Sequence, residues 1–113
     1  MKKKKSNSDI TPAKKKVYER IAEEATMDCY GEYEQLSGWA CLLDESIPTP
    51  CECLLGKEKA VLEKIDTDDN GLCIVGKVRF GRLRLRVLFQ DISFEQPGAM
   101  DYANAYRHWC NNG

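Results

Sequence analysis

Two groups of acidic residues lie on either side of a tryptophan in the first half of the chain. They are Asp28, Glu32 and Glu34 before Trp39, and Asp44 and Glu45 after it. Hard cations such as calcium take about six to eight oxygen ligands, many of them from carboxylates. A chain that turns at Gly31 and Gly38 would bring both groups around one ion, with Trp39 as a buried anchor between them. Acidic loops are also common on solvated surfaces, so the spacing alone leaves both interpretations open.

The same segment resembles a known family. The motif Tyr30-Gly-Glu-x-Glu-x-x-x-Gly-Trp39 is preceded by Asp28 and followed by Leu43-Asp44-Glu45. In this arrangement it is similar to the CcbP-like family of small cyanobacterial calcium-binding proteins. The likeness extends over residues 17–110 and is strongest in residues 28–48.

This resemblance implies a compact, mostly β domain that binds calcium through surface carboxylates without an EF-hand. The ligands that it implies are Asp28, Glu32, Glu34, Asp44 and Glu45. Magnesium is the expected competitor for such oxygen ligands. Tyr33 stands where the family often places another acid, and we expect this difference to lower the affinity for calcium.

The charge of the chain is unevenly distributed. Residues 1–16 carry seven lysines and one aspartate, whereas residues 17–113 carry ten basic and seventeen acidic residues. We therefore expect a disordered basic leader over residues 1–10 and a single acidic domain over residues 11–113. An acidic body attracts cations and disfavours nucleic acid as a partner, and the pattern leaves an unidentified protein partner open.

No apolar run is long enough to cross a membrane, and the lysine-rich start is not followed by a hydrophobic signal core. These features predict a cytoplasmic protein without a membrane partner. In such a compartment the six cysteines are expected to be reduced. Cys51-Glu-Cys53 would point two thiols to one face of a strand, but it lacks the paired spacing of structural zinc sites.

The apolar periodicity predicts a small α+β domain. Thr11-Pro12 starts an amphipathic helix over residues 12–26, and Pro97-Gly98 introduces a last helix over about residues 98–110. A short helix or irregular turn is expected over residues 35–43. About five short antiparallel strands follow and are expected to curl into a half-open, SH3-like barrel on which the helices pack. The expected strands cover residues 51–55, 60–65, 72–78, 82–89 and 91–93.

Asp66-Thr-Asp-Asp-Asn-Gly71 matches the first six positions of an EF-hand loop. The position that should supply a bidentate glutamate is Lys77, and the flanks have a β-like pattern. Asn70-Gly71 between two apolar runs is typical of a hairpin. We therefore predict a β-turn with an acidic tip, at which a second, weak cation contact stays open.

Arginines and apolar residues alternate over residues 82–87, so Arg82, Arg84 and Arg86 are expected on one face of a strand. This face gives the alternative function, a nucleic-acid or phosphate-binding SH3-like module. The acidic charge of the domain argues against it, and Phe80 is the only aromatic residue close by.

The chain carries none of the motifs expected of an enzyme. There is no glycine-rich phosphate loop, nucleophile elbow or metal-hydrolase motif. His108 is the only histidine, and the sequence offers it no nucleophile or acid partner. We therefore predict that the protein binds an ion and is not an enzyme.

Overall fold

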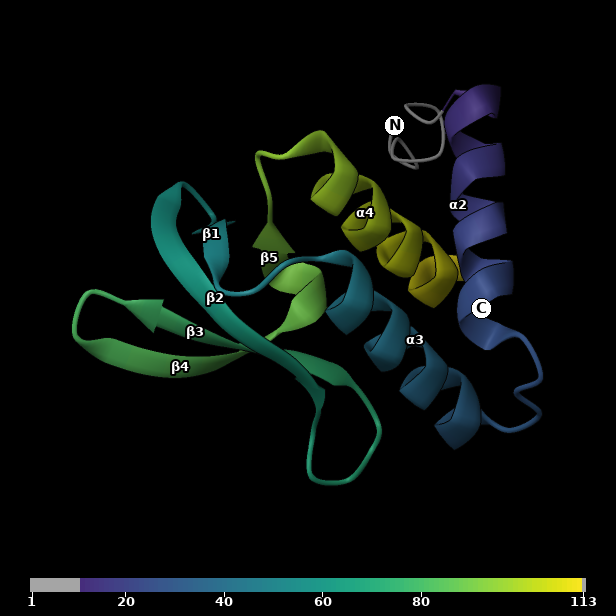
Figure 1. Cartoon of the computed structure of the whole chain (residues 1–113), viewed down its shortest axis with the longest axis horizontal. Helices are drawn as coiled ribbons and strands as arrows, with labels where there is room; N and C mark the ends of the chain where they lie inside the picture. The colour runs from purple at the N-terminus through teal and green to yellow at the C-terminus, as the bar shows by residue number, and fades with distance from the viewer. Residues whose placement is uncertain (1–10, 113) are drawn as a thin grey trace, which may run out of the picture.

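A computed structural model describes residues 11–112 of the chain. Three helices pack with a five-stranded antiparallel sheet (Figure 1). The elements are α2 (Pro12–Thr26), α3 (Glu32–Ser46), β1 (Cys51–Leu55), β2 (Glu58–Thr67), β3 (Ile74–Phe80), β4 (Leu83–Leu88), the 3-10 turn η1 (Phe89–Asp91), β5 (Ile92–Ser93) and α4 (Pro97–Asn112). The predicted leader, residues 1–10, lies outside the described residues.

Helix α2 has the bounds that the sequence predicted. The backbone N–H of Lys14 donates to the Thr11 hydroxyl oxygen at 3.1 Å, which satisfies one of the donors left unpaired at a helix start. Tyr18, Ile21 and Ala25 form its buried stripe at helical spacing, and Val17 is half-buried beside it. This stripe packs α2 against α3 and α4.

Helix α3 is longer than the sequence predicted. It is a continuous helix of 15 residues, and Gly38 lies inside it, so the expected turn at Gly38 is wrong. The apolar residues that it buries recur at helical spacing, and burial of this stripe favours a continuous helix over an irregular turn. They are Leu36, Trp39, Leu42 and Leu43. The helix ends before the proline-containing segment that leads to β1.

The five strands form one open sheet with the order β4-β3-β2-β1-β5. All pairs are antiparallel, and the register shifts between Leu62 and Lys64 where β2 meets β3. The α+β class and the antiparallel strands are confirmed. The sheet is not closed, and the predicted SH3-like barrel is not confirmed. Strand β4 forms one outer edge, and the β3–β4 hairpin projects away from the helices (Figure 1).

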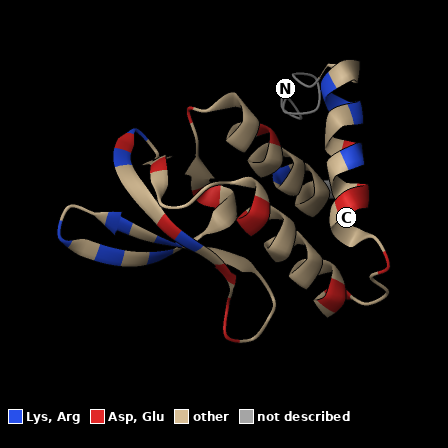
Figure 2. Ribbon diagram, in the orientation of Figure 1, with Lys and Arg blue, Asp and Glu red and all other residues tan. Residues whose placement is uncertain are grey.

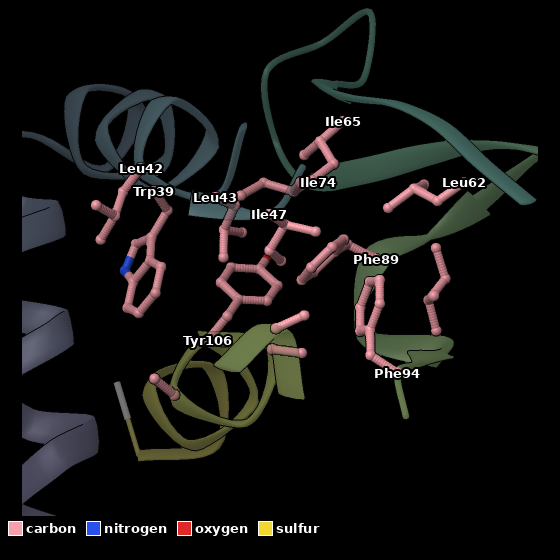
Figure 3. Packing of buried hydrophobic residues seen from close by; sticks show 14 of the residues in the cluster. Trp39, Leu42, Leu43, Ile47, Leu62, Ile65, Ile74, Phe89, Phe94 and Tyr106 are labelled. Atoms are coloured by element: carbon pink, nitrogen blue, oxygen red, sulfur yellow. The ribbon is translucent and has the colours of Figure 1, made fainter. Parts of the chain in front are cut away.

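The core lies between α3, α4 and the sheet (Figure 3). Trp39, Tyr106 and Phe89 are its largest buried side chains. The rings of Trp39 and Tyr106 meet edge to face at 5.4 Å between centroids, and Phe89 contacts Tyr106 at 5.9 Å. The prediction that Trp39 is buried is therefore confirmed, and its burial fixes the middle of α3.

Candidate functional site

Helix α3 carries four of the five predicted ligands, and it places them at opposite ends. Glu32 and Glu34 lie in its first turn, whereas Asp44 and Glu45 lie in its last two turns. At about 1.5 Å of rise per residue, the two groups are separated by roughly 15 to 20 Å along the helix axis. This is too far for one ion to contact both, so the acids divide into two separate groups. Within residues 11–112, no three acidic, cysteine or histidine side chains are grouped as a ready metal site.

The first group surrounds the corner between α2 and α3. Asp28 lies in this corner with a φ angle of 61°, a left-handed conformation that aspartate adopts more readily than most residues. The backbone N–H of Cys29 donates to the Thr26 carbonyl at 3.0 Å, which closes the end of α2. The backbone N–H of Tyr30 donates to Oε1 of Glu34 at 3.1 Å. The carboxylate of Glu34 therefore reaches back over the corner that holds Asp28.

Gly38 explains why this corner is held firmly. A Cβ atom at Gly38 would lie 2.1 Å from the Ala25 carbonyl oxygen and 3.2 Å from the Cys29 sulfur, so only glycine allows α2 and α3 to approach this closely. The contact lies in the last turn of α2, next to its end at Thr26, and fixes the corner from inside the fold. Sequence analysis assigned Gly38 to a turn, although a glycine inside an amphipathic run also indicates close helix packing.

The second group lies at the other end of α3. Asp44 and Glu45 are exposed, and no basic residue lies in the last turn of the helix. The carboxyl end of a helix carries a partial negative charge, so two carboxylates there are electrostatically unfavourable without a neighbouring cation. The chain is closed at this end by the Ile47 N–H, which donates to the Leu43 carbonyl at 2.9 Å. This end of α3 therefore attracts positive charge.

The loop between β2 and β3 resembles an EF-hand only in sequence. It forms the predicted hairpin, and Asp68 serves as its internal acceptor: Oδ1 accepts the backbone N–H of Leu72 at 2.7 Å and that of Cys73 at 3.2 Å. The hydrogen bond from Leu72, with those from Cys73 and Gly71, lowers the pKa of Asp68. Asp68 is thus engaged in holding the loop.

Tyr33 connects this loop to the first acid group. A Cβ atom at Gly71 would lie 3.2 Å from the ring of Tyr33, so the ring packs directly on the loop backbone. Gly71 also has a φ angle of 70°, which favours glycine. Tyr33, the position at which the resemblance led us to expect an acid, braces the start of α3 against the β2–β3 loop.

A cavity of about 380 Å³ opens beside this contact. It lies between the start of α3, the β2–β3 loop and the end of α4, and sequence analysis missed it because these segments are far apart in the chain. Burial raises the pKa of Tyr106 and that of Cys110, so both groups stay protonated at neutral pH. The lining residues are Glu32, Tyr33, Gln35, Leu36, Gly71, Leu72, Cys73, Gln90, Tyr106, Trp109 and Cys110.

The cysteines of β1 are poor ligands for a soft metal at neutral pH. Cys53 is buried, and burial raises its pKa to about 11; burial also raises the pKa of Cys51. Metal binding requires the thiolate, and burial disfavours this charged form of both cysteines. The corner between α2 and α3 and the end of α3 therefore remain the candidate cation sites, and their ligands are carboxylates.

No protein-family model and no curated protein sequence matches the chain. Solved structures do match it. A calcium-binding protein in its calcium-binding form has a TM-score of 0.72 and 17% sequence identity, over 88% of this chain and 92% of that chain. CcbP from Anabaena has a TM-score of 0.71 and 17% identity, over 85% of this chain and 89% of that chain. The chain has the fold of CcbP. The resemblance drawn from the motif around Trp39 is thus confirmed at the level of the fold.

The two matches cover most of the chain, 88% and 85% of it. Among the described residues, no helix of this CcbP-like fold is both long and apolar enough to cross a membrane.

Proposed function

We propose that the protein binds calcium reversibly and acts as a cytoplasmic calcium buffer or sensor. The observation that carries this proposal is the likeness of 88% of the chain to a protein solved in its calcium-binding form. The acidic corner between α2 and α3 supplies the chemistry that such binding needs. Its three carboxylates are exposed and lie within seven residues of one another on a fixed backbone.

The principal site in this proposal is the corner, with Asp28, Glu32 and Glu34 as ligands. Calcium accepts carboxylates in flexible geometry, and backbone carbonyls or water complete its coordination. The ion would offset the repulsion between the three side chains. Because the contact between Gly38 and Ala25 already holds the backbone, only side chains need to be ordered on binding, which limits the entropic cost.

A second, weaker contact is proposed at the end of α3. Asp44 and Glu45 supply two carboxylates there, and the partial negative charge of the helix end adds to their attraction for a cation. Fewer carboxylates than at the corner imply a lower affinity. The bracing role of Tyr33 removes a further acid from the corner, so we expect weaker binding there than in family members with an acid at this position.

Calorimetric titration with calcium, repeated in the presence of magnesium, tests this proposal. Neutralising the corner should weaken the tighter binding step by at least about tenfold, since each 1.4 kcal/mol corresponds to a factor of ten. Neutralising the end of α3 should remove only the weaker step. The two variants are Asp28→Asn with Glu32→Gln and Glu34→Gln, and Asp44→Asn with Glu45→Gln.

A matched control removes three exposed acids elsewhere. The control variant is Glu19→Gln with Glu58→Gln and Glu95→Gln, and these side chains lie outside both acid groups. It should retain both binding steps, because loss of overall negative charge acts only weakly at these distances in salt. If the corner variant keeps the full calcium affinity of the natural chain, or if the control loses as much as the corner variant, the assigned site is wrong.

A further inference from the structure

Strand β4 presents an open backbone edge. It is the outer strand of the sheet, and among the described residues it pairs with β3 alone. An unpaired edge exposes N–H and C=O groups that can accept an additional strand. The β3–β4 hairpin projects away from the helices (Figure 1), and the residues of β4 are exposed apart from Val87, which is half-buried.

One face of β4 carries leucines that the core does not cover. Leu85 lies opposite Val78 and Leu83 lies opposite Phe80, so the predicted alternation places them on the core side of the sheet. The core does not cover them, however, because 59% of Leu83 and 38% of Leu85 are exposed. The hairpin extends away from the helices (Figure 1), and the two leucines form an exposed apolar strip beside the open edge.

The other face of β4 is basic. Arg84 lies opposite Arg79, and Arg86 lies opposite Lys77, so like charges meet twice across the strand pair (Figure 2). Such pairs destabilise a sheet unless anions compensate them. Glu63 lies 3.0 Å from Arg79 and 3.9 Å from Arg84.

Arg86 has a more distant acidic neighbour. Asp69 of the β2–β3 loop lies 3.7 Å from it, and its own side chain is 91% exposed. Exposed pairs of this kind contribute little to stability. The basic face of the hairpin is therefore only partly neutralised by the described part of the chain.

We propose that the β4 edge binds an extended peptide segment in which apolar and acidic residues alternate. The segment would add to the sheet beside β4, with its apolar side chains against Leu83 and Leu85 and its carboxylates toward Arg84 and Arg86. Main-chain hydrogen bonds give affinity in this mode of recognition, and the alternating side chains give specificity. The inference is independent of calcium binding.

The positive charge of the β4 face favours an acidic peptide over a second copy of the chain or its own lysine-rich first residues. Antiparallel pairing of two β4 edges, with the leucines on one face, would set Arg84 of one copy against Arg86 of the other. The chain's own first residues are lysine-rich and would repel the same face. A nucleic acid would meet the arginines, but it would leave the leucines and the backbone edge unused. An acidic, alternating peptide complements all three features.

Fluorescence anisotropy with labelled synthetic peptides tests this inference on the full chain. The probe is a short capped peptide of alternating valine and glutamate. A block peptide of the same composition, with all valines before all glutamates, controls for charge and apolarity without alternation. A valine–lysine peptide reverses the charge, and an oligothymidylate of equal charge represents a nucleic acid. Only the alternating acidic peptide should bind saturably, at least about tenfold more tightly than any of the other three.

Variants of exposed residues locate the binding. Leu83→Ser with Leu85→Ser, and Arg84→Glu with Arg86→Glu, should each weaken binding of the alternating peptide by about tenfold or more. Arg20→Glu reverses an exposed charge on α2 and should leave binding unchanged. Unfolding curves measured alongside verify that each variant is folded.

Several results would overturn the inference. If the block peptide or the oligothymidylate binds as tightly as the alternating peptide, the surface binds anions in general and does not recognise an added strand. Sedimentation showing a dimer that the β4 variants disrupt would assign the edge to a second copy of the chain. Absence of binding by the alternating peptide at millimolar concentration would leave the edge without the occupant proposed.

Discussion

The two ends of α3 carry the same kind of side chain in opposite electrostatic settings. At the start, Glu32 and Glu34 face the partial positive charge of the helix end, which stabilises them without any ion. At the other end, Asp44 and Glu45 face a partial negative charge and lack a basic neighbour in the last turn. The partial charges at the helix ends therefore stabilise the carboxylates of the first turn and destabilise those of the last turn.

The ends also differ in how they are held. The first is fixed to α2 by the close approach of Gly38 to Ala25 and is braced on the β2–β3 loop by Tyr33. The second leads into the segment that connects to β1. Under the proposed function, ion binding and helix stability can therefore be separated. Calcium at the corner would gain from a rigid backbone, whereas a cation at the other end would relieve an unfavourable charge.

The largest effect is expected from Gly38→Ala. The new Cβ would meet the backbone oxygen of Ala25 at 2.1 Å, and backbone atoms cannot move aside as a flexible side chain can. We expect the free energy of unfolding to fall by about 3 kcal/mol, as measured by urea denaturation. Calcium affinity should fall with it, because the corner loses its anchor.

Gly98→Ala provides the matched control. Gly98 lies in the first turn of α4, and nothing lies within 4 Å of the position that a Cβ would take. Alanine favours a helix over glycine, so this variant should be neutral or more stable by up to about 1 kcal/mol. Equal stability of Gly38→Ala and the natural chain would show that α2 and α3 do not depend on their close contact.

Neutralising the two acid groups should have effects of opposite sign on the calcium-free protein. Glu32→Gln with Glu34→Gln removes carboxylates from the favourable end of α3 and should lower the free energy of unfolding by about 1 kcal/mol. Asp44→Asn with Glu45→Gln should raise it by about the same amount. Denaturation at low ionic strength with a chelator measures both.

The same measurements at high salt and in calcium test the electrostatic origin of these effects. Both changes in the free energy of unfolding should shrink at high ionic strength, because the interaction of the carboxylates with the helix ends is screened. In saturating calcium, the gain of the Asp44 and Glu45 variant should also shrink, because a bound cation relieves the same unfavourable charge. A destabilised Asp44 and Glu45 variant would contradict the comparison drawn between the two ends.

The smallest effect is expected from acid titration of the β2–β3 loop. The pKa of Asp68 lies below its ordinary value of 3.8, because the folded loop donates hydrogen bonds to its ionised form, first from Leu72. Its contribution to stability is therefore complete above about pH 4 and is lost as the pH falls through the folded pKa. Melting temperatures measured from about pH 5 to about pH 2.5 should decline more steeply in the natural chain than in Asp68→Asn.

The loop contacts the first end of α3 through Tyr33 and Gly71. Acid loosening of the loop should therefore increase amide hydrogen exchange near the α2–α3 corner before it does so at the other end of the helix. If the melting temperature declines equally in the natural chain and in Asp68→Asn, then the ionisation of Asp68 does not contribute to the acid sensitivity of the fold.

Local sequence patterns predicted those helices and strands whose bounds are set by a few neighbouring residues. The N-cap at Thr11 and the proline after it placed α2 correctly, and the alternation around Cys53 placed β1 correctly. Composition and strand count also predicted the α+β class. These features depend on residues that are close in sequence, so their physical effect can be judged without the fold.

The arrangement of the site depends on contacts between distant segments. The sequence alone suggests a turn at Gly38, because its close contact with Ala25 of α2 is not visible there. Since Gly38 instead lies inside a continuous helix, the two acid groups are held at opposite ends of α3. The exposure of Leu83 could not be predicted from alternation, because alternation gives the face of a strand but not whether a helix covers it. The cavity near Tyr33 likewise joins three segments that no local pattern connects.

The burial of Trp39 has a practical consequence. This residue lies in α3 between the two acid groups, and its ring centroid is 5.7 Å from that of Trp109, the only other tryptophan in the chain. A small displacement of α3 relative to α4 changes the surroundings of both indoles at once. The intrinsic tryptophan fluorescence of the protein should therefore report cation binding at either end of α3, without any attached dye.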